Sequence, residues 1–97
     1  MGELTYEPLS PEAQTALLAE LPGWTIQGGM LTKIYALPSY AAGVMFASSI
    51  GHLADQLNHH PDLLILYGKV QVSMITHDAG GLTAYDFELA RRIEAIA

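Results

Sequence analysis

Two pairs of strand-like segments, each joined by a short turn that contains glycine, most constrain what this chain can fold into. Residues 24–36 are divided by Gly28-Gly29, and residues 63–76 are divided by Gly68-Lys69. Because glycine readily takes the positive φ that tight two-residue turns require, each pair of segments predicts a β-hairpin. Together the two hairpins predict a four-stranded antiparallel sheet.

The second hairpin also has the alternation of a strand with one buried face. Successive side chains of a strand point to opposite faces of the sheet. One face of residues 70–76 is therefore predicted to carry Val70, Val72, Met74 and Thr76, and the other Gln71, Ser73 and Ile75.

Two helices are predicted from their first residues and from the spacing of apolar residues. Ser10 suits a helix cap and Pro11 suits the first helical position, so a short helix is expected between Ser10 and Pro22. Ser39 is expected to cap a long helix, because apolar residues then recur every three or four positions. Its inward face is predicted to carry Phe46, Ile50, Leu53 and Leu57, and its opposite face the small residues Ala47, Ser48 and Gly51.

A third helix is predicted near the end of the chain. Thr83 followed by Asp86 approximates a capping box. The inward face of this helix is predicted to carry Phe87, Ala90, Ile93 and Ala97. The order helix, hairpin, helix, hairpin, helix predicts an α+β fold in which three helices cover one face of the four-stranded antiparallel sheet. With no repeat or linker-like segment, residues 1–97 are expected to form one domain.

The composition argues against several classes of partner. The net charge is −6 with only four Lys and Arg residues, whereas a nucleic-acid interface needs a basic patch. No stretch has the length and apolarity of a membrane span or of a leader, and there is no cysteine, so a cytoplasmic protein is expected. Hydrophobic residues make up 51% of the chain and charged residues 14%, which favours a homo-oligomer.

The strongest functional signal is a group of histidines beside carboxylates. His59-His60-Pro61 is expected at the end of the long helix, one turn after Asp55, and His77-Asp78 at the end of a strand. Because the ordinary pKa of histidine lies near neutrality, this group favours general acid–base catalysis. One alternative is that the adjacent histidines only cap the helix. Zinc binding is the other, but no His-x-x-x-His spacing is present, so no metal is predicted.

The spacing of these residues resembles that of the pterin-4a-carbinolamine dehydratase family. The family pattern is an acidic residue, His-His-Pro after three residues, an aromatic residue, a later histidine and an aspartate. In this chain the matching residues are Asp55, His59, His60, Pro61, Tyr67, His77 and Asp86. The resemblance is strongest over residues 39–97. Leu63 departs from it, since many members carry tryptophan there.

The resemblance implies a reaction, namely dehydration of a 4a-hydroxytetrahydropterin to a quinonoid dihydropterin without a metal or other cofactor. It implies that His60 and His77 act as acids towards the leaving hydroxyl, and that His59 orients the ring and takes the N5 proton. Asp55 is expected to hold the His59 imidazole, because the two lie four residues apart on the predicted helix. Further contacts with the pterin are implied for Asn58, Thr76, Asp78 and Trp24.

Three other residues are given structural interpretations. Asp86 is interpreted as a cap of the last helix, Tyr67 as packing at the hairpin behind the pocket, and His52 as a surface histidine. By resemblance, the protein would take part in tetrahydrobiopterin recycling for an aromatic amino acid hydroxylase, as a dimer or a tetramer built through the long helix. The alternative is a binding module of the same fold that serves as an assembly factor or dimerisation cofactor for another protein.

Overall fold

Both predicted hairpins and all three predicted helices are present in the computed structural model, which describes residues 3–97. The elements are α1 (Pro11–Leu18), β1 (Thr25–Gln27), β2 (Met30–Ala36), α2 (Tyr40–Leu57), β3 (Asp62–Leu66), β4 (Lys69–Met74), the 3₁₀-helix η1 (His77–Ala79) and α3 (Ala84–Ile96). Within the described residues, no helix combines the length and apolarity needed to cross a membrane. The strands form one antiparallel sheet in the order β1-β2-β4-β3, which confirms the predicted α+β class.

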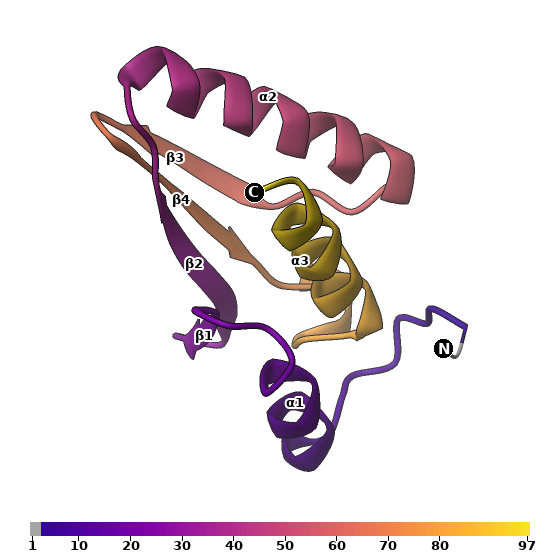
Figure 1. The fold of residues 1–97 in the computed structure, drawn as a ribbon. Helices are drawn as coiled ribbons and strands as arrows, with labels where there is room; N and C mark the ends of the chain where they lie inside the picture. The colour runs from indigo at the N-terminus through magenta and orange to yellow at the C-terminus, as the bar shows by residue number, and fades with distance from the viewer. Residues whose placement is uncertain (1–2) are drawn as a thin grey trace.

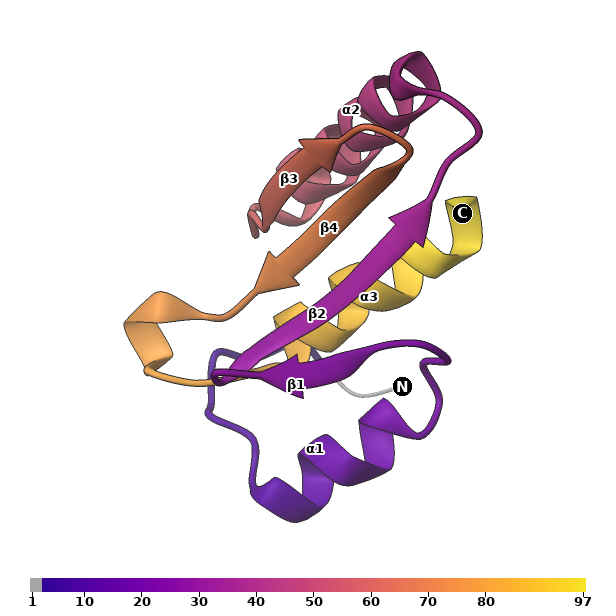
Figure 2. The same ribbon diagram turned by 90° about the vertical axis from the view of Figure 1, so that its left-hand side faces the viewer.

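The core lies between the sheet and two of the helices. α2 and α3 run across one side of the sheet, and α1 lies beside the edge formed by β1 (Figure 1, Figure 2). Leu31 of β2 and Val70 and Val72 of β4 are fully buried at 0% exposure. The alternation predicted for β4 is confirmed, since Val70, Val72 and Met74 are buried whereas Gln71 and Ser73 are only partly buried.

Small residues bring α2 close to the sheet. The buried residues of α2 are Gly43, Ala47, Ile50 and Ala54. Three further residues that were predicted to point inward are partly buried and pack against the core, namely Phe46, Leu53 and Leu57. A Cβ added to Gly43 would lie 3.4 Å from Val70 Cγ2, so the glycine permits a close approach of α2 to β4. The prediction that Ala47 lies on the opposite face is wrong, because this helix packs partly through its small residues.

The turn of the second hairpin lies one residue earlier than predicted. Tyr67 and Gly68 connect β3 to β4, and Gly68 has a φ of 78°. Tyr67 lies at the tip of the turn, beyond the covered part of the sheet, and is 87% exposed. The prediction that Tyr67 packs behind the pocket is therefore wrong.

α3 begins at the predicted capping box, which is confirmed. The Thr83 hydroxyl accepts a hydrogen bond from the N–H of Tyr85, and the Asp86 carboxylate accepts one from the N–H of Thr83 at 2.9 Å. The residues buried as predicted are Phe87, Ala90 and Ile93. Ala97 is exposed, contrary to the prediction, because the helix ends at Ile96.

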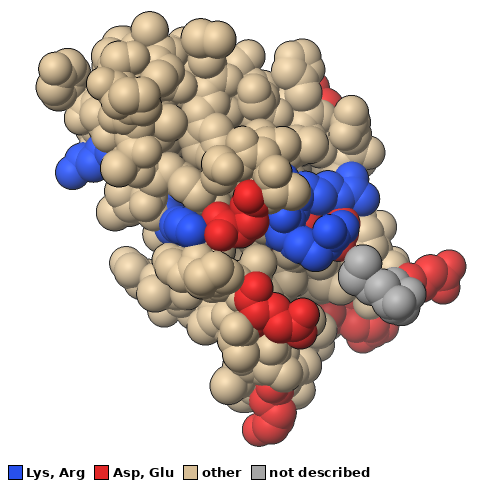
Figure 3. All heavy atoms as spheres, in the orientation of Figure 1, with Lys and Arg blue, Asp and Glu red and all other residues tan. Residues whose placement is uncertain are grey.

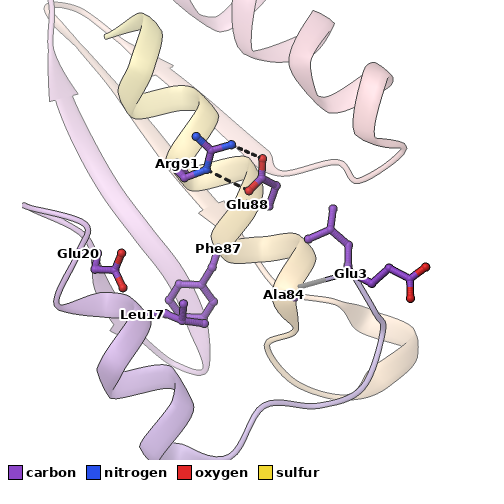
Figure 4. Close-up of a pocket in the computed structure, with 8 residues that line it drawn as sticks. Glu3, Leu17, Glu20, Ala84, Phe87, Glu88 and Arg91 are labelled. Carbon is purple, nitrogen blue, oxygen red and sulfur yellow. Dashed lines mark hydrogen bonds and ion pairs between the residues drawn. The ribbon is translucent and has the colours of Figure 1, made fainter. Parts of the chain in front are cut away.

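Charged side chains pair with one another around α3. The buried Glu88 carboxylate accepts hydrogen bonds of 2.6 to 3.0 Å from Arg91 and Arg92, and the contact with Arg91 is drawn in Figure 4. Lys33 of β2 lies 2.9 Å from Glu94. Near the centre of Figure 3, basic side chains lie next to acidic ones. The hydrogen bond from Arg91 lowers the pKa of the Glu88 carboxyl, outweighing the effect of its burial.

We expect Glu88→Gln to lower the free energy of unfolding by about 1 kcal/mol at pH 7, because it removes the charge that two arginines solvate. A carboxyl whose pKa is lowered by folding stabilises the protein above its unfolded-state pKa, and this contribution is lost as the pH falls through the folded-state pKa. Urea unfolding of variant and wild type should therefore differ most near neutrality and converge below about pH 4. A difference that is independent of pH would contradict this account.

Candidate active site

The chain changes direction immediately after α2, and this turn separates the two adjacent histidines. Asn58 follows the helix with φ 49° and ψ 44°, the left-handed conformation common at helix ends. Pro61 then prevents the helix from resuming. As a result, His59 turns inward and is 7% exposed, whereas the His60 side chain is 58% exposed.

Asp86 is the partner of His59. His59 Nε2 lies 2.6 Å from Asp86 Oδ1, and the Asp86 side chain is 0% exposed. Asp86 Oδ2 accepts hydrogen bonds from the Thr76 hydroxyl at 2.8 Å and from the Thr83 N–H at 2.9 Å. A buried carboxylate needs such donors, because an unpaired charge away from water is costly. Asp86 thus has the predicted role of a helix cap and a second one, which the sequence analysis missed.

This second role fixes the orientation of the His59 ring. An ionised carboxylate only accepts hydrogen bonds, so His59 Nε2 carries the proton that lies between the two groups. The other ring nitrogen, Nδ1, is not engaged by Asp86. The Thr76 and Thr83 hydroxyls also lie 2.8 Å apart, which joins the ends of β4 and α2 to the start of α3 in one buried network.

Asp55 contacts the other histidine. Asp55 Oδ1 lies 3.0 Å from His60 Nε2, and the two side chains are 78% and 58% exposed. The prediction that Asp55 holds His59 is wrong, because the left-handed Asn58 takes the chain out of the helix before His59. A contact between two such exposed side chains contributes little to stability, but it places the Asp55 carboxylate beside the His60 ring.

One cavity of about 600 Å³ gathers most of the predicted site residues. It is lined by Tyr6, Asn58, His59, His60, Ile75, Thr76, His77 and Asp78. His59 and His60 reach it from the end of α2, and His77 reaches it from η1. Six of the eight residues predicted for the site therefore meet here, including all three predicted catalytic histidines.

The other two predicted residues, Trp24 and Asp55, do not line this cavity. Trp24 is 4% exposed and packs edge-on against Tyr35 in the core, with ring centroids 6.2 Å apart. Asp55 and Leu63 line an adjacent cavity of about 450 Å³, which shares His60 with the first one. The structure thus places the Leu63 departure from the family pattern outside the cavity of the three histidines.

Tyr6 and Ile75 line the histidine cavity although the sequence analysis did not select them. Ile75 follows β4 and could have been found from its position beside Thr76. The position of Tyr6 depends on where the segment before α1 packs, which no local pattern encodes.

The arrangement is suited to proton transfer. Three imidazoles, the Asn58 amide and the Asp78 carboxylate line the same cavity. One of the imidazoles, that of His59, is held by the buried Asp86 carboxylate. Side chains of this kind can donate a proton to one atom of a bound molecule and accept one from another. Among residues 3–97, no group of three or more His, Asp or Glu side chains lies close enough together to hold a metal ion.

Comparison with known proteins identifies the family. The family model described as pterin 4 alpha carbinolamine dehydratase matches residues 7–96. A protein of Roseiflexus sp. (strain RS-1), provisionally named a pterin-4-alpha-carbinolamine dehydratase, is 46% identical over 79 residues, which cover 81% of this chain and 85% of the relative. A Streptomyces coelicolor protein with the same provisional name is 42% identical over 92 residues, covering 94% and 91%. The chain belongs to the pterin-4-alpha-carbinolamine dehydratase family.

Two solved structures are similar to this one. The crystal structure of a transcriptional coactivator/pterin dehydratase from Brucella melitensis has a TM-score of 0.89 at 27% identity, covering 94% of this chain and 99% of that one. A pterin dehydratase-like protein identified as a RuBisCO assembly factor in the alpha-carboxysome has a TM-score of 0.64 at 26% identity, covering 77% and 89%. The same fold thus occurs in proteins described in different functional terms.

We expect Asp86→Asn to lower the free energy of unfolding by about 3 kcal/mol, because an amide nitrogen would meet hydrogen-bond donors where a buried carboxylate now accepts. Urea unfolding at pH 7 measures the loss. Glu88→Gln is the matched control, since it removes a buried carboxylate from the same helix without touching His59. Equal losses in the two variants would contradict the importance given to the Asp86 network.

Proposed function

We propose that this protein converts a 4a-hydroxytetrahydropterin, such as 4a-hydroxytetrahydrobiopterin, to the quinonoid dihydropterin and water. The observation that carries the proposal is that the imidazoles of His59, His60 and His77 line one cavity of about 600 Å³. This volume is typical of small-molecule sites and accommodates a bicyclic pterin. Membership of the family supports the same activity.

The reaction requires that one proton is given and another is taken. The bond from C4a to the hydroxyl oxygen breaks as this oxygen gains a proton and leaves as water. N5 loses its proton as the double bond between C4a and N5 forms. Imidazoles suit both transfers near neutral pH, and the balance requires no metal, nucleotide or redox cofactor.

We propose the division of roles that the family resemblance implies. His60 and His77 act as acids towards the leaving hydroxyl, and Asp55 positions the His60 ring. His59 orients the pterin and takes the N5 proton. Its Nε2 is held by Asp86, which leaves Nδ1 as the nitrogen that can accept a proton.

Other polar groups of the cavity suit the pyrimidine edge of a pterin. The Asn58 amide can both donate and accept, and the Asp78 carboxylate can accept from amino and ring N–H groups. The Thr76 hydroxyl already donates to Asp86, so in this proposal it acts through the position of His59 rather than through a bond of its own to the substrate.

The activity would take place in the cytoplasm as part of tetrahydrobiopterin recycling. An aromatic amino acid hydroxylase releases the 4a-hydroxy form of its cofactor, and dehydration is the step that prepares this product for reduction. We propose this link because the chain belongs to the pterin-4-alpha-carbinolamine dehydratase family.

Dehydration of a 4a-hydroxytetrahydropterin generated in situ tests the proposal, because the reaction changes the ultraviolet absorbance. The wild-type protein should accelerate it over the uncatalysed rate. His59→Ala and His60→Ala should each lower kcat by about 100-fold or more, since each removes a proton-transfer group. His52→Ala is the control, because this exposed histidine of α2 does not line the histidine cavity. Near-wild-type turnover in both His59→Ala and His60→Ala would contradict the proposed mechanism.

A second function is favoured by one observation, the similarity to the RuBisCO assembly factor. In that case this chain would bind another protein and its histidine cavity would be idle. A folded wild-type protein that does not accelerate the dehydration would support this alternative.

We also propose that the protein forms a homo-oligomer through α2. Three large apolar residues of this helix are exposed: Tyr40 at 53%, Val44 at 43% and Met45 at 70%. The surface over α2, at the top of Figure 3, carries almost no charged side chains. Burying this surface against a second copy would remove apolar area from water.

Replacing Met45 with glutamate should therefore shift a dimer or tetramer towards the monomer, because it puts a charge into the apolar surface of α2. Sedimentation velocity at micromolar concentration measures the change. Glu12→Gln, on the exposed side of α1, is the control and should sediment as wild type. A wild-type protein that sediments as a monomer would contradict the proposal.

A further inference from the structure

The segment before α1 packs along the start of α3. The N–H of Leu9 donates to the Leu82 carbonyl at 2.9 Å. Tyr6 stacks on Tyr85, with ring centroids 4.2 Å apart and planes inclined by 12°. These contacts hold the segment between two cavities, one of which contains the three histidines.

The cavity on the other side of the segment lacks the proton-transfer groups of the histidine cavity. It has a volume of about 260 Å³, and Figure 4 shows its lining. Leu17 and Phe87 make it largely apolar, and the Glu88 carboxylate and the Arg91 guanidinium at its wall already bind each other. The cavity contains no histidine. The side of the segment that carries Tyr6 is therefore the one that meets the histidines.

Tyr6 connects the N-terminal segment to the catalytic histidines. Tyr85, on which it stacks, has its ring centroid 5.8 Å from that of His59. Tyr6 itself lines the cavity of the three histidines and is 51% exposed, so about half of its surface is free to meet a ligand. It is the only Tyr, Phe or Trp among the described residues that line this cavity.

The hydroxyl of Tyr6 lies in a setting that keeps it protonated. Partial desolvation, the neighbouring Tyr85 and the charge of Asp78 raise the pKa of the Tyr6 phenol. The group therefore remains a hydrogen-bond donor in a cavity that the Asp78 carboxylate also lines.

Resting on the proposed function, we propose that Tyr6 is a substrate-binding residue whose ring packs against the planar pterin, with Tyr85 holding it in place. It supplies the aromatic contact that the sequence analysis expected from Trp24, which the structure places in the core. A flat aromatic ring beside a flat heterocycle contributes attraction and orientation without taking part in proton transfer. Tyr6 therefore affects binding more than chemistry.

Binding of 7,8-dihydrobiopterin, which has no 4a-hydroxyl to lose, tests the proposal by titration calorimetry. Tyr6→Ala should raise Kd by about tenfold, and should raise KM for the 4a-hydroxytetrahydropterin similarly while kcat changes less than about threefold. Tyr6→Phe, which keeps the ring, should recover most of the lost affinity. Tyr67→Ala is the matched control, because this tyrosine is 87% exposed at the β3–β4 turn.

The outcomes separate this inference from the proposed function. Wild-type affinity and KM in Tyr6→Ala would overturn the inference alone. A loss of kcat as large as that of His60→Ala, without a change in Kd, would also overturn it, because Tyr6 would then act in chemistry. If the wild-type protein binds the ligand but has no dehydratase activity, the proposed reaction is wrong. The Kd of Tyr6→Ala compared with that of the wild type then still decides whether Tyr6 binds the ligand. Absence of both binding and turnover in the wild type would overturn both.

Discussion

The structure depends on one buried carboxylate. Asp86 has 0% of its side chain exposed and is surrounded by donors from three parts of the chain: His59 after α2, Thr76 after β4 and Thr83 before α3. Removing a carboxylate from water is costly unless its hydrogen-bonding capacity is filled, so these three parts must come together for Asp86 to be buried. The need to satisfy the Asp86 carboxylate therefore joins these three parts of the chain and also sets the orientation of the His59 ring.

Packing elsewhere makes this meeting possible. Gly43 and Ala47 let α2 lie close to β4, and Ala54 continues the buried side of the helix to its last turn, just before Asn58 reverses the chain. A Cβ at Gly43 would already be in contact with Val70 Cγ2 at 3.4 Å, so little space remains between this part of α2 and β4. The position of α2 on the sheet therefore decides where its last turn, and the His59 that follows it, lies. His60, His77 and Asp78, in contrast, lie on exposed segments around the cavity, where a substrate can reach them.

Local patterns predicted the elements well, because turns and caps are determined by a few neighbouring residues. The Gly28-Gly29 turn, the Ser39 cap and the capping box of Thr83 were all found in this way. The histidines were found from their spacing. The pairing of side chains across the fold was predicted wrongly. Helical spacing assigned Asp55 as the partner of His59, but the left-handed Asn58 ends the helix before His59. The carboxylate that contacts His59 is that of Asp86. Tyr6 was missed for a related reason, since only the packed structure brings it to α3.

The central claim is that Asp86 holds His59 through the proton on Nε2, and nitrogen-15 NMR of the histidine side chains tests it most directly. The account predicts that His59 carries its proton on Nε2 at neutral pH, and that this proton is shifted downfield and exchanges slowly with water because it is shared with a buried carboxylate. An unprotonated Nε2, or an Nε2 proton that exchanges as fast as that of the exposed His52, would contradict the account.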